Sequence, residues 1–150
     1  MPIHILEREQ RIRAARADVF AFFADAFNLE SITPPLLGFQ VLTPAPIAMA
    51  TGTLIAYKMR VHRVPVRWLT RIESWEPQSG FTDRQLRGPY SLWHHVHTFE
   101  DCAEGTLMRD RVSYALPLGP LGAVAHALFV RRDLERIFDF RRDAVARVLG

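Results

Sequence analysis

The sequence predicts an α+β fold in which a curved antiparallel sheet of six or seven strands wraps around one long C-terminal helix. Two changes in the period of apolar side chains along the 150 residues carry this prediction. Over residues 38–114, apolar and polar side chains alternate with the period of two that is typical of strands. After residue 120, apolar side chains recur with the helical period of 3.6. Short turns separate the alternating runs, so neighbouring strands should pair antiparallel.

The N-terminal part adds one strand and two short helices to this plan. Residues 3–13 alternate apolar and polar side chains and predict the first strand. A helix is expected from Arg16 onward, because Asp18 suits a first helical turn and phenylalanines follow at helical spacing. A second short helix is predicted at residues 28–33, ended by Pro34.

Six further strands are predicted between the second short helix and the long helix. Their expected bounds are residues 39–43, 53–60, 64–75, 81–87, 90–100 and 106–115. The dipeptides Gly88–Pro89 and Glu104–Gly105 mark turns between them. This order of elements is that of an antiparallel meander rather than a succession of parallel βαβ units.

The C-terminal helix is expected to run for nearly thirty residues after a loop rich in glycine and proline. One apolar stripe marks the helix and consists of Leu121, Val124, Leu128, Leu134, Phe138, Val145 and Val148. A helix with such a stripe must bury it against another apolar surface. The concave face of the sheet is the only predicted surface that is large enough, so the helix should lie across it.

Length and composition fit a single domain that spans residues 1–150 and builds its own hydrophobic core. Cys102 is the only cysteine, which rules out an intrachain disulfide and favours a reducing, cytoplasmic location. The sequence contains no apolar run long enough to cross a membrane, and its N-terminus carries no export signal.

The charge pattern argues against nucleic-acid binding. The formal net charge is only +3, and Lys58 is the sole lysine. Acidic residues accompany the arginines along the C-terminal helix, at residues 131–136 and 141–143. Such mixing is typical of a solvated helix face rather than of a phosphate-binding stripe. An alternative function for this arginine-rich face is to dock an acidic protein or a membrane surface.

Three segments, residues 29–35, 87–90 and 93–99, carry a family resemblance within this order of elements. The whole chain resembles the SRPBCC superfamily, which includes START domains and polyketide cyclase-like proteins, and is similar in particular to small bacterial SRPBCC ligand-binding domains. The resemblance implies the helix-grip fold, with an internal cavity between sheet and C-terminal helix for lipids, polyketides or other apolar molecules. Such domains also occur beside an epimerase-like domain, which implies an oxidoreductase- or epimerase-like partner protein. A superfold of this kind does not name a reaction.

Alternation along the strands predicts which side chains face this cavity. With Ile72 and Phe99 taken as core-facing anchors, every second residue in register points inward. We predict as ligand-binding side chains Tyr57, Met59, Trp68, Asp83, Gln85, Trp93, His95, His97, Asp110 and Tyr114. Core packing explains Tyr57 and Met59 at least as well.

Two histidines and two aspartates should meet on this inner face. A tight hairpin turn places Asp83 near His95, and His97 can approach Asp110 across the next strand pair. A buried carboxylate is costly unless it is paired, so we expect one network that holds the polar end of an otherwise apolar ligand. The alternatives are a purely structural cluster, or a surface group if the assigned faces are reversed.

Binding of a small, largely hydrophobic molecule is therefore the expected function, with catalytic residues unassigned. A metal held by His95, His97 and Asp110 is conceivable, but a His-x-His pair alone is common, so neither metal nor cofactor is predicted. The sequence has no glycine-rich phosphate loop and no Gly-x-Ser-x-Gly nucleophile motif. The alternative function is a cyclase, dehydratase or isomerase that uses the His/Asp network as general acid and base.

Overall fold

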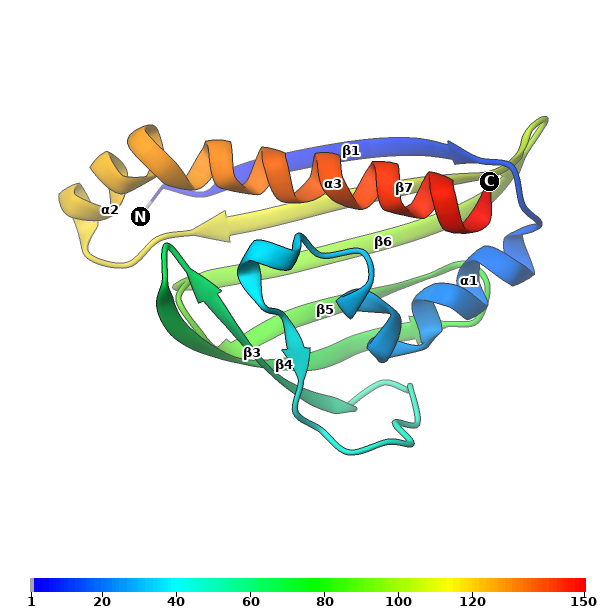
Figure 1. The fold of residues 1–150 in the computed structure, drawn as a ribbon, viewed down its shortest axis with the longest axis horizontal. Helices are drawn as coiled ribbons and strands as arrows, with labels where there is room; N and C mark the ends of the chain where they lie inside the picture. Colours follow the sequence, from blue (N-terminus) through cyan, green and yellow to red (C-terminus); the bar gives the residue numbers. More distant parts are fainter. Residues whose placement is uncertain (1) are drawn as a thin grey trace.

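The computed structural model describes residues 2–150 and contains one seven-stranded antiparallel sheet (Figure 1). The strands are β1 (His4–Ile12), β2 (Gln40–Val41), β3 (Leu54–Val61), β4 (Val64–Glu76), β5 (Gly80–Arg87), β6 (Leu92–Cys102) and β7 (Gly105–Ala115). Their order across the sheet is β1-β7-β6-β5-β4-β3-β2, so β2 to β7 form the predicted meander and β1 pairs with β7. Each predicted strand is present, with bounds that differ by at most two residues.

The segment between β1 and β2 differs in part from the prediction. Helix α1 (Arg16–Ala24) begins at the predicted residue. The second short helix is present as the 3-10 helix η1 (Ala26–Glu30), two residues earlier than predicted at its start, and a further 3-10 turn, η2 (Pro35–Leu37), follows it. The first turn begins early because the Asp25 side chain accepts a hydrogen bond from the Phe27 backbone N–H. A proline begins η2, since its missing N–H is one that a first turn leaves unpaired.

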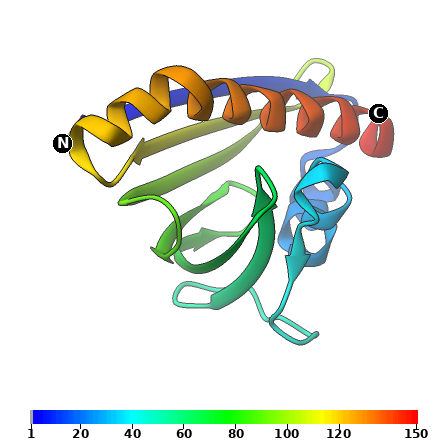
Figure 2. The same cartoon turned by 60° about the vertical axis from the view of Figure 1, so that its left-hand side comes forward.

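The long C-terminal helix is present and lies across the concave side of the sheet (Figure 2). It comprises α2 (Gly119–Ala125), a π-helical turn η3 (His126–Val130) and α3 (Arg131–Leu149), 31 residues in all. None of the helices within residues 2–150 is long and apolar enough to cross a membrane.

Only the middle of the predicted apolar stripe on this helix is buried. Its buried members are Leu134, Phe138 and Val145, whereas Leu121, Val124, Leu128 and Val148 are exposed. Two features explain the exposure of Leu121, Val124 and Leu128. The wider π-helical turn η3 shifts the register of the stripe, and α2 lies beyond the end of β7, where no sheet remains to cover it (Figure 1).

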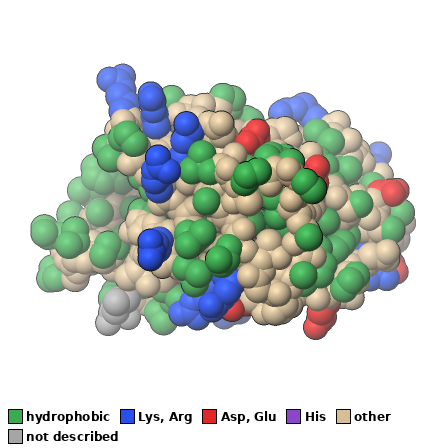
Figure 3. All heavy atoms as spheres, turned by 90° about the horizontal axis from the view of Figure 1, so that it is seen from below, with side chains coloured by type: hydrophobic (Ala, Val, Ile, Leu, Met, Phe, Trp, Pro, Cys, Tyr) green, Lys and Arg blue, Asp and Glu red, His purple; other side chains and the backbone are tan. Residues whose placement is uncertain are grey.

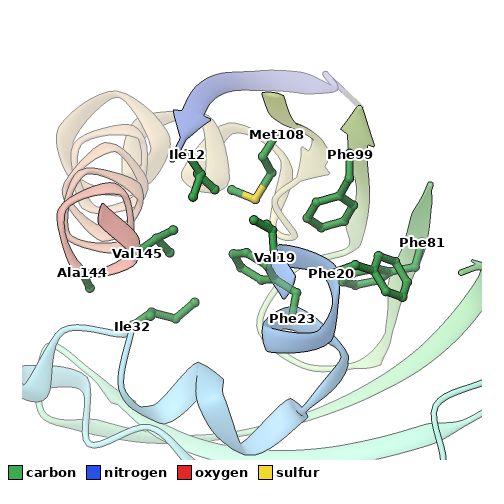
Figure 4. Packing of buried hydrophobic residues seen from close by; sticks show 10 residues of the cluster. All are labelled: Ile12, Val19, Phe20, Phe23, Ile32, Phe81, Phe99, Met108, Ala144 and Val145. Atoms are coloured by element: carbon green, nitrogen blue, oxygen red, sulfur yellow. The ribbon is translucent and has the colours of Figure 1, made fainter. Parts of the chain in front are cut away.

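One end of the concave face, beneath α1, is filled by a solid hydrophobic cluster (Figure 4). Its buried members are Ile12, Val19, Phe20, Phe23, Ile32, Phe81, Phe99, Met108, Ala144 and Val145. The Phe20 ring packs edge-on against Phe99, with centroids 5.4 Å apart, and against Phe81 at 6.3 Å. We call this part of the molecule the closed end.

The opposite end, beneath α2 and η3, is less completely packed, and we call it the open end. Aromatic side chains line the inner face of the sheet here, among them Trp68, Tyr90, Trp93 and Tyr114. Hydrophobic side chains also gather on the surface where α2 lies (Figure 3). The exposed ones are Leu118, Leu121, Val124, Leu128 and Phe129.

Candidate functional site

The strands place all ten predicted side chains on inward positions. The buried ones are Tyr57, Trp93, His95, His97, Asp110 and Tyr114. The half-buried ones are Met59, Trp68, Asp83 and Gln85. The burial pattern alternates along β6 and β7, as expected for strands with one covered face. The surface alternative, in which the assigned faces are reversed, is thereby excluded.

The two histidines and two aspartates form one hydrogen-bonded network between β5, β6 and β7, which we call the His/Asp network. His95 Nε2 lies 2.8 Å from Asp110 Oδ1, and His97 Nε2 lies 2.6 Å from Asp83 Oδ2. In the strand register, Asp83 is opposite His95 and His97 is opposite Asp110. The shortest contacts are thus diagonal rather than straight across the strand pairs.

The stacking of the two imidazoles explains this diagonal pattern. His95 and His97 are two residues apart on β6, and their ring centroids are 3.6 Å apart with an interplanar angle of 25°. Phe81 stacks on His97, with centroids 4.1 Å apart. Because the ring faces are covered in this way, only the ring edges, which carry the nitrogens, are left to meet the carboxylates.

Each carboxylate of the network faces one nitrogen of each imidazole. Besides the two short contacts, His97 Nδ1 lies 3.3 Å from Asp110 Oδ1, and His95 Nδ1 lies 4.0 Å from Asp83 Oδ2. Asp110 is the deeper carboxylate, with 5% of its side chain exposed against 17% for Asp83. The network therefore has a deep side at Asp110 and a more accessible side at Asp83.

Two opposing effects, burial and hydrogen bonding, set the pKa values of the four side chains in the network. Burial alone raises the pKa of Asp110, but hydrogen bonds with His95 and His97 outweigh it and hold that pKa well below its usual range. The pKa of Asp83 is lowered in the same way, with His97 as the main partner. Burial lowers the pKa of His95, whereas hydrogen bonds with both aspartates overcome burial and raise the pKa of His97. The network thus favours ionised carboxylates and makes His97 the more basic of the two histidines, because its pKa is raised while that of His95 is lowered.

Arg141 of α3 completes the charge balance, and our reading of the sequence missed it. Its positive charge contributes to the low pKa of Asp83. The guanidinium carbon lies 5.0 Å from the centre of the Phe138 ring, and Nε is buried without a hydrogen-bond partner among residues 2–150. A signal was present in the sequence, since Arg141 occupies the helical position between Phe138 and Val145 on the apolar stripe.

An aromatic wall adjoins the network on the side of the open end. Trp93 lies edge-on to His95 at 6.2 Å and edge-on to Trp68 at 5.2 Å, counted between ring centroids. Tyr90 packs against both tryptophans. The pKa of Tyr90 is raised, mainly by burial, so this phenol stays neutral.

Gln85 lies apart from the network, although it was predicted to bind ligand. Its side-chain Nε2 donates to the Tyr90 carbonyl at 2.7 Å, and its Oε1 accepts from the Tyr90 N–H at 3.1 Å. Both ends of the amide are therefore engaged with the backbone of the β5–β6 connection. This pairing orders the connection and also explains why β6 begins at Leu92 rather than at Tyr90.

The turn between β3 and β4 bridges from the sheet to the long helix. His62 Nε2 lies 2.6 Å from Asp133 Oδ2 of α3, and the His62 ring lies 5.8 Å from that of Phe129. His62 and Arg63 both have positive φ, the conformation of a two-residue hairpin turn. The bridge joins two sides of the concave face at the open end.

Two hollows lie beside the long helix. A hollow of about 370 Å³ lies between β1 and α3, and its lining includes Tyr114, His126, Arg131 and Leu134. A smaller one of about 70 Å³ is lined by Asp110, Phe138 and Arg141, among others. Of the ten predicted ligand-binding residues, Tyr114 lines the larger hollow and Asp110 the smaller. The internal cavity between sheet and C-terminal helix, which the resemblance implies, stays a prediction.

The residues of the network also have the chemistry of metal ligands. Candidate ligand atoms of Asp83, His95 and His97 all lie within 4.8 Å of one another. This set contains Asp83, whereas the sequence suggested Asp110 as the carboxylate partner of the two histidines. Imidazole nitrogen and carboxylate oxygen are ordinary ligands of zinc and other first-row divalent ions.

A curved antiparallel sheet that grips a long C-terminal helix, with a polar network on its inner face, defines an α+β domain of the helix-grip class. Within that class, the chain belongs to the family described as polyketide cyclase / dehydrase and lipid transport, whose profile matches residues 12–141. The family resemblance seen in the sequence is thereby confirmed. No curated protein sequence matched the chain.

Solved structures share the fold along nearly the whole chain. The Zhui aromatase/cyclase from Streptomyces sp. R1128 superposes with a TM-score of 0.76 at 15% identity, covering 99% of this chain and 94% of that one. The protein TTHA0849 from Thermus thermophilus superposes with a TM-score of 0.72 at 17% identity, covering 99% of this chain and 100% of that one. A START superfamily protein from Mycobacterium smegmatis superposes with a TM-score of 0.69 at 11% identity, covering 97% of this chain and 99% of that one. At these identities the likeness establishes the fold alone.

Proposed function

We propose that this protein binds a small, largely hydrophobic organic molecule, such as a lipid or an aromatic polyketide, between the concave face of the sheet and the long helix. The observation that carries the proposal is the contact between the aromatic wall and the His/Asp network, where Trp93 lies against His95. A ligand there would place apolar surface on the tryptophans and a polar substituent on the histidines and aspartates. This combination is typical of small-molecule sites.

Desolvation of the ligand would supply most of the affinity. Each 100 Å² of apolar surface that is removed from water contributes about 2.5 kcal/mol. Trp68 is half-buried and forms an edge-on pair with Trp93, so it retains surface that a ligand can cover. The network would then fix the orientation of the ligand, because its donors and acceptors are held in place by the strands.

Calorimetry or native mass spectrometry with fatty acids, aromatic acids and polyketide-like compounds tests the proposal. Trp68→Ala should lower the affinity of a bound compound by about 2 kcal/mol, or roughly 30-fold. Leu54→Ala is the matched control, because Leu54 lies on the neighbouring strand β3 and is 50% exposed at an outward position. Failure of every compound to bind, or equal effects of the two substitutions, would contradict the proposal.

The enzyme alternative makes a separate prediction for the same site. A cyclase, dehydratase or isomerase that uses the network as acid and base would lose turnover in His95→Ala while its ligand affinity survives. A binding protein would lose affinity in this variant and has no turnover to lose. Parallel measurement of binding and product formation with one compound separates the two functions.

Two further predictions accompany this proposal. The family resemblance supports an oxidoreductase- or epimerase-like partner protein, which co-purification from the native source would test. The single cysteine supports a cytoplasmic location. Cell fractionation would test the location.

A further inference from the structure

We propose that Asp83, His95 and His97 form a binding site for a first-row divalent metal ion such as Zn²⁺, with Asp110 as the carboxylate that orients both histidines. Their candidate ligand atoms lie within 4.8 Å of one another and come from two neighbouring strands. This inference goes beyond the binding of an organic molecule and does not depend on it.

The two imidazoles present their nitrogens in matching pairs. His97 Nε2 and His95 Nδ1 point toward Asp83 Oδ2, at 2.6 and 4.0 Å. His97 Nδ1 and His95 Nε2 point toward Asp110 Oδ1, at 3.3 and 2.8 Å. One nitrogen of each ring is thus available as a ligand on the Asp83 side, while the other is held on the Asp110 side.

The contacts on the Asp110 side are those that a metal site requires. A histidine that binds a metal donates its other ring N–H to a carboxylate or carbonyl, which fixes its tautomer and its orientation. Here a single buried carboxylate, Asp110, serves both rings at once.

The spacing on the Asp83 side fits a metal after small movements. Ligands about 2.05 Å from a tetrahedral ion are separated from one another by roughly 3.3 Å. The observed separations from Asp83 Oδ2 are 2.6 Å to His97 and 4.0 Å to His95, so they bracket this value. Each has to change by about 0.7 Å, and the stacked rings of His95 and His97 also have to tilt apart, because nearly parallel rings cannot direct both nitrogen lone pairs at one ion.

Solvent access indicates on which side of the His/Asp network an ion would bind, and the types of ligand atom indicate which class of ion it would be. The Asp83 side chain is 17% exposed and that of Asp110 only 5%, so an ion would enter on the Asp83 side. Two imidazoles and one carboxylate suit Zn²⁺, Co²⁺ or Fe²⁺ rather than Ca²⁺ or Mg²⁺, which prefer oxygen ligands. Three protein ligands leave a coordination position for water or for an oxygen atom of a bound molecule.

Titration of chelator-stripped protein with Zn²⁺ by calorimetry, and with Co²⁺ by visible absorption, tests the site. We expect one ion per chain and the ligand-field bands of a Co²⁺ ion bound by nitrogen and oxygen. In NMR spectra of the unmodified protein, the ring signals of His95 and His97 should shift with added Zn²⁺. The signals of His94, which lies on the opposite face of β6, should not shift.

Variants then separate the ligands from the orienting carboxylate. Asp110→Asn should weaken Zn²⁺ binding by about 10- to 100-fold. Asp83→Asn should weaken it more, because Asp83 supplies a ligand. His94→Ala is the matched control and should bind as the original chain does, with circular dichroism showing that each variant is folded.

Three results would overturn the inference. The first is absence of Zn²⁺ and Co²⁺ binding by the unmodified chain at micromolar concentrations. The second is binding that survives in Asp83→Asn but is lost in Asp110→Asn, which would place the ion on the deep side. The third is a ring-signal shift of His94 without one of His95 and His97. The first and third need no variant, so a variant that fails to fold does not prevent a decision.

Discussion

The closed end and the open end of the concave face are built from the same kinds of residue but packed to different degrees. At the closed end, Phe20 of α1 packs against Phe81 and Phe99 of the sheet, and each of the three is less than 8% exposed. At the open end, Leu121 and Leu128 of the long helix are 71% and 59% exposed. A hollow of about 370 Å³ lies beside the helix there.

This difference assigns stability mainly to the closed end of the sheet and ligand recognition to the open end. At the closed end, side chains of α1, the sheet and the end of α3 form one buried hydrophobic cluster, whose packing contributes to stability. The open end retains apolar surface that is not covered by the chain itself, and the His/Asp network lies next to its aromatic wall. Substitutions should therefore affect folding at one end and recognition at the other.

The largest effect is expected for Phe99→Ala at the closed end. Phe99 is 3% exposed and contacts the rings of Phe20, Phe23 and Phe81. Loss of this ring should lower the free energy of unfolding by about 3–5 kcal/mol, because it leaves a cavity that rigid neighbours cannot fill. Urea denaturation followed by circular dichroism measures it. A loss below about 1 kcal/mol would mean that the closed end is not tightly packed.

An intermediate effect is expected for Gly122→Ala in α2. A Cβ atom at this position would clash with the carbonyl oxygen of Pro117, so α2 would have to move away from the preceding loop. We expect a loss of about 1–3 kcal/mol together with faster hydrogen exchange in α2. Val124→Ala, at an exposed position of the same helix, serves as the control. Unchanged exchange in α2 would show that the loop can yield.

A smaller effect is expected for Leu128→Ser, which removes an exposed leucine from the open end. The free energy of unfolding should change by no more than about 0.5 kcal/mol. Leu134→Ser is the matched control on the same helix, where the leucine is 4% exposed, and should cost about 2–5 kcal/mol. Similar losses in thermal or chemical unfolding for the two variants would remove the distinction between the ends.

The smallest effect concerns the titration of His126, which lines the larger hollow. Burial, followed by the charges of His4 and Arg131, lowers its pKa below the ordinary 6.5. Tyr114 and Glu135 also face this position. The neutral form is favoured in the folded protein, so the contribution of His126 to stability is present above pH 6.5 and is lost as the pH falls.

NMR titration of the His126 ring checks this prediction. The measured pKa should lie below 6.5 and should rise in His4→Gln, which removes one neighbouring positive charge. A pKa at or above 6.5 in the unmodified chain would show that the ring is solvated and that the open end is looser than the contacts indicate.

The period of apolar side chains predicted the strands and helices well where one face of the element is buried. It predicted every strand and the inward face of β3 to β7, because a shift by one residue would turn Trp93, His95 and His97 out of the core together. In β1 the apolar alternation misled, since Ile3 and Ile5 are exposed. It misplaced the bounds of the second short helix, which was predicted at residues 28–33, because the Asp25 side chain and Pro35 determine the 3-10 turns locally. It also overestimated the buried length of the helical stripe, which depends on where the sheet ends.

The candidate site could be predicted as a set of residues but not as a geometry. The strand register brought Asp83, His95, His97 and Asp110 together. The diagonal pairing depends on the stacked rings of His95 and His97. Arg141 was overlooked, because a charged residue on an apolar stripe acquires a meaning only when the facing strand is known to carry Asp83.

The sequence by itself determined the order of strands and helices and the inward face of the strands β3 to β7. Both follow from local periodicity and turn residues, which act over a few neighbouring positions. The tertiary structure alone decided which carboxylate meets which imidazole nitrogen, where Arg141 reaches the sheet, and which end of the helix stays uncovered. These features depend on distances of a few ångströms between residues far apart in the chain, and no local pattern encodes such distances.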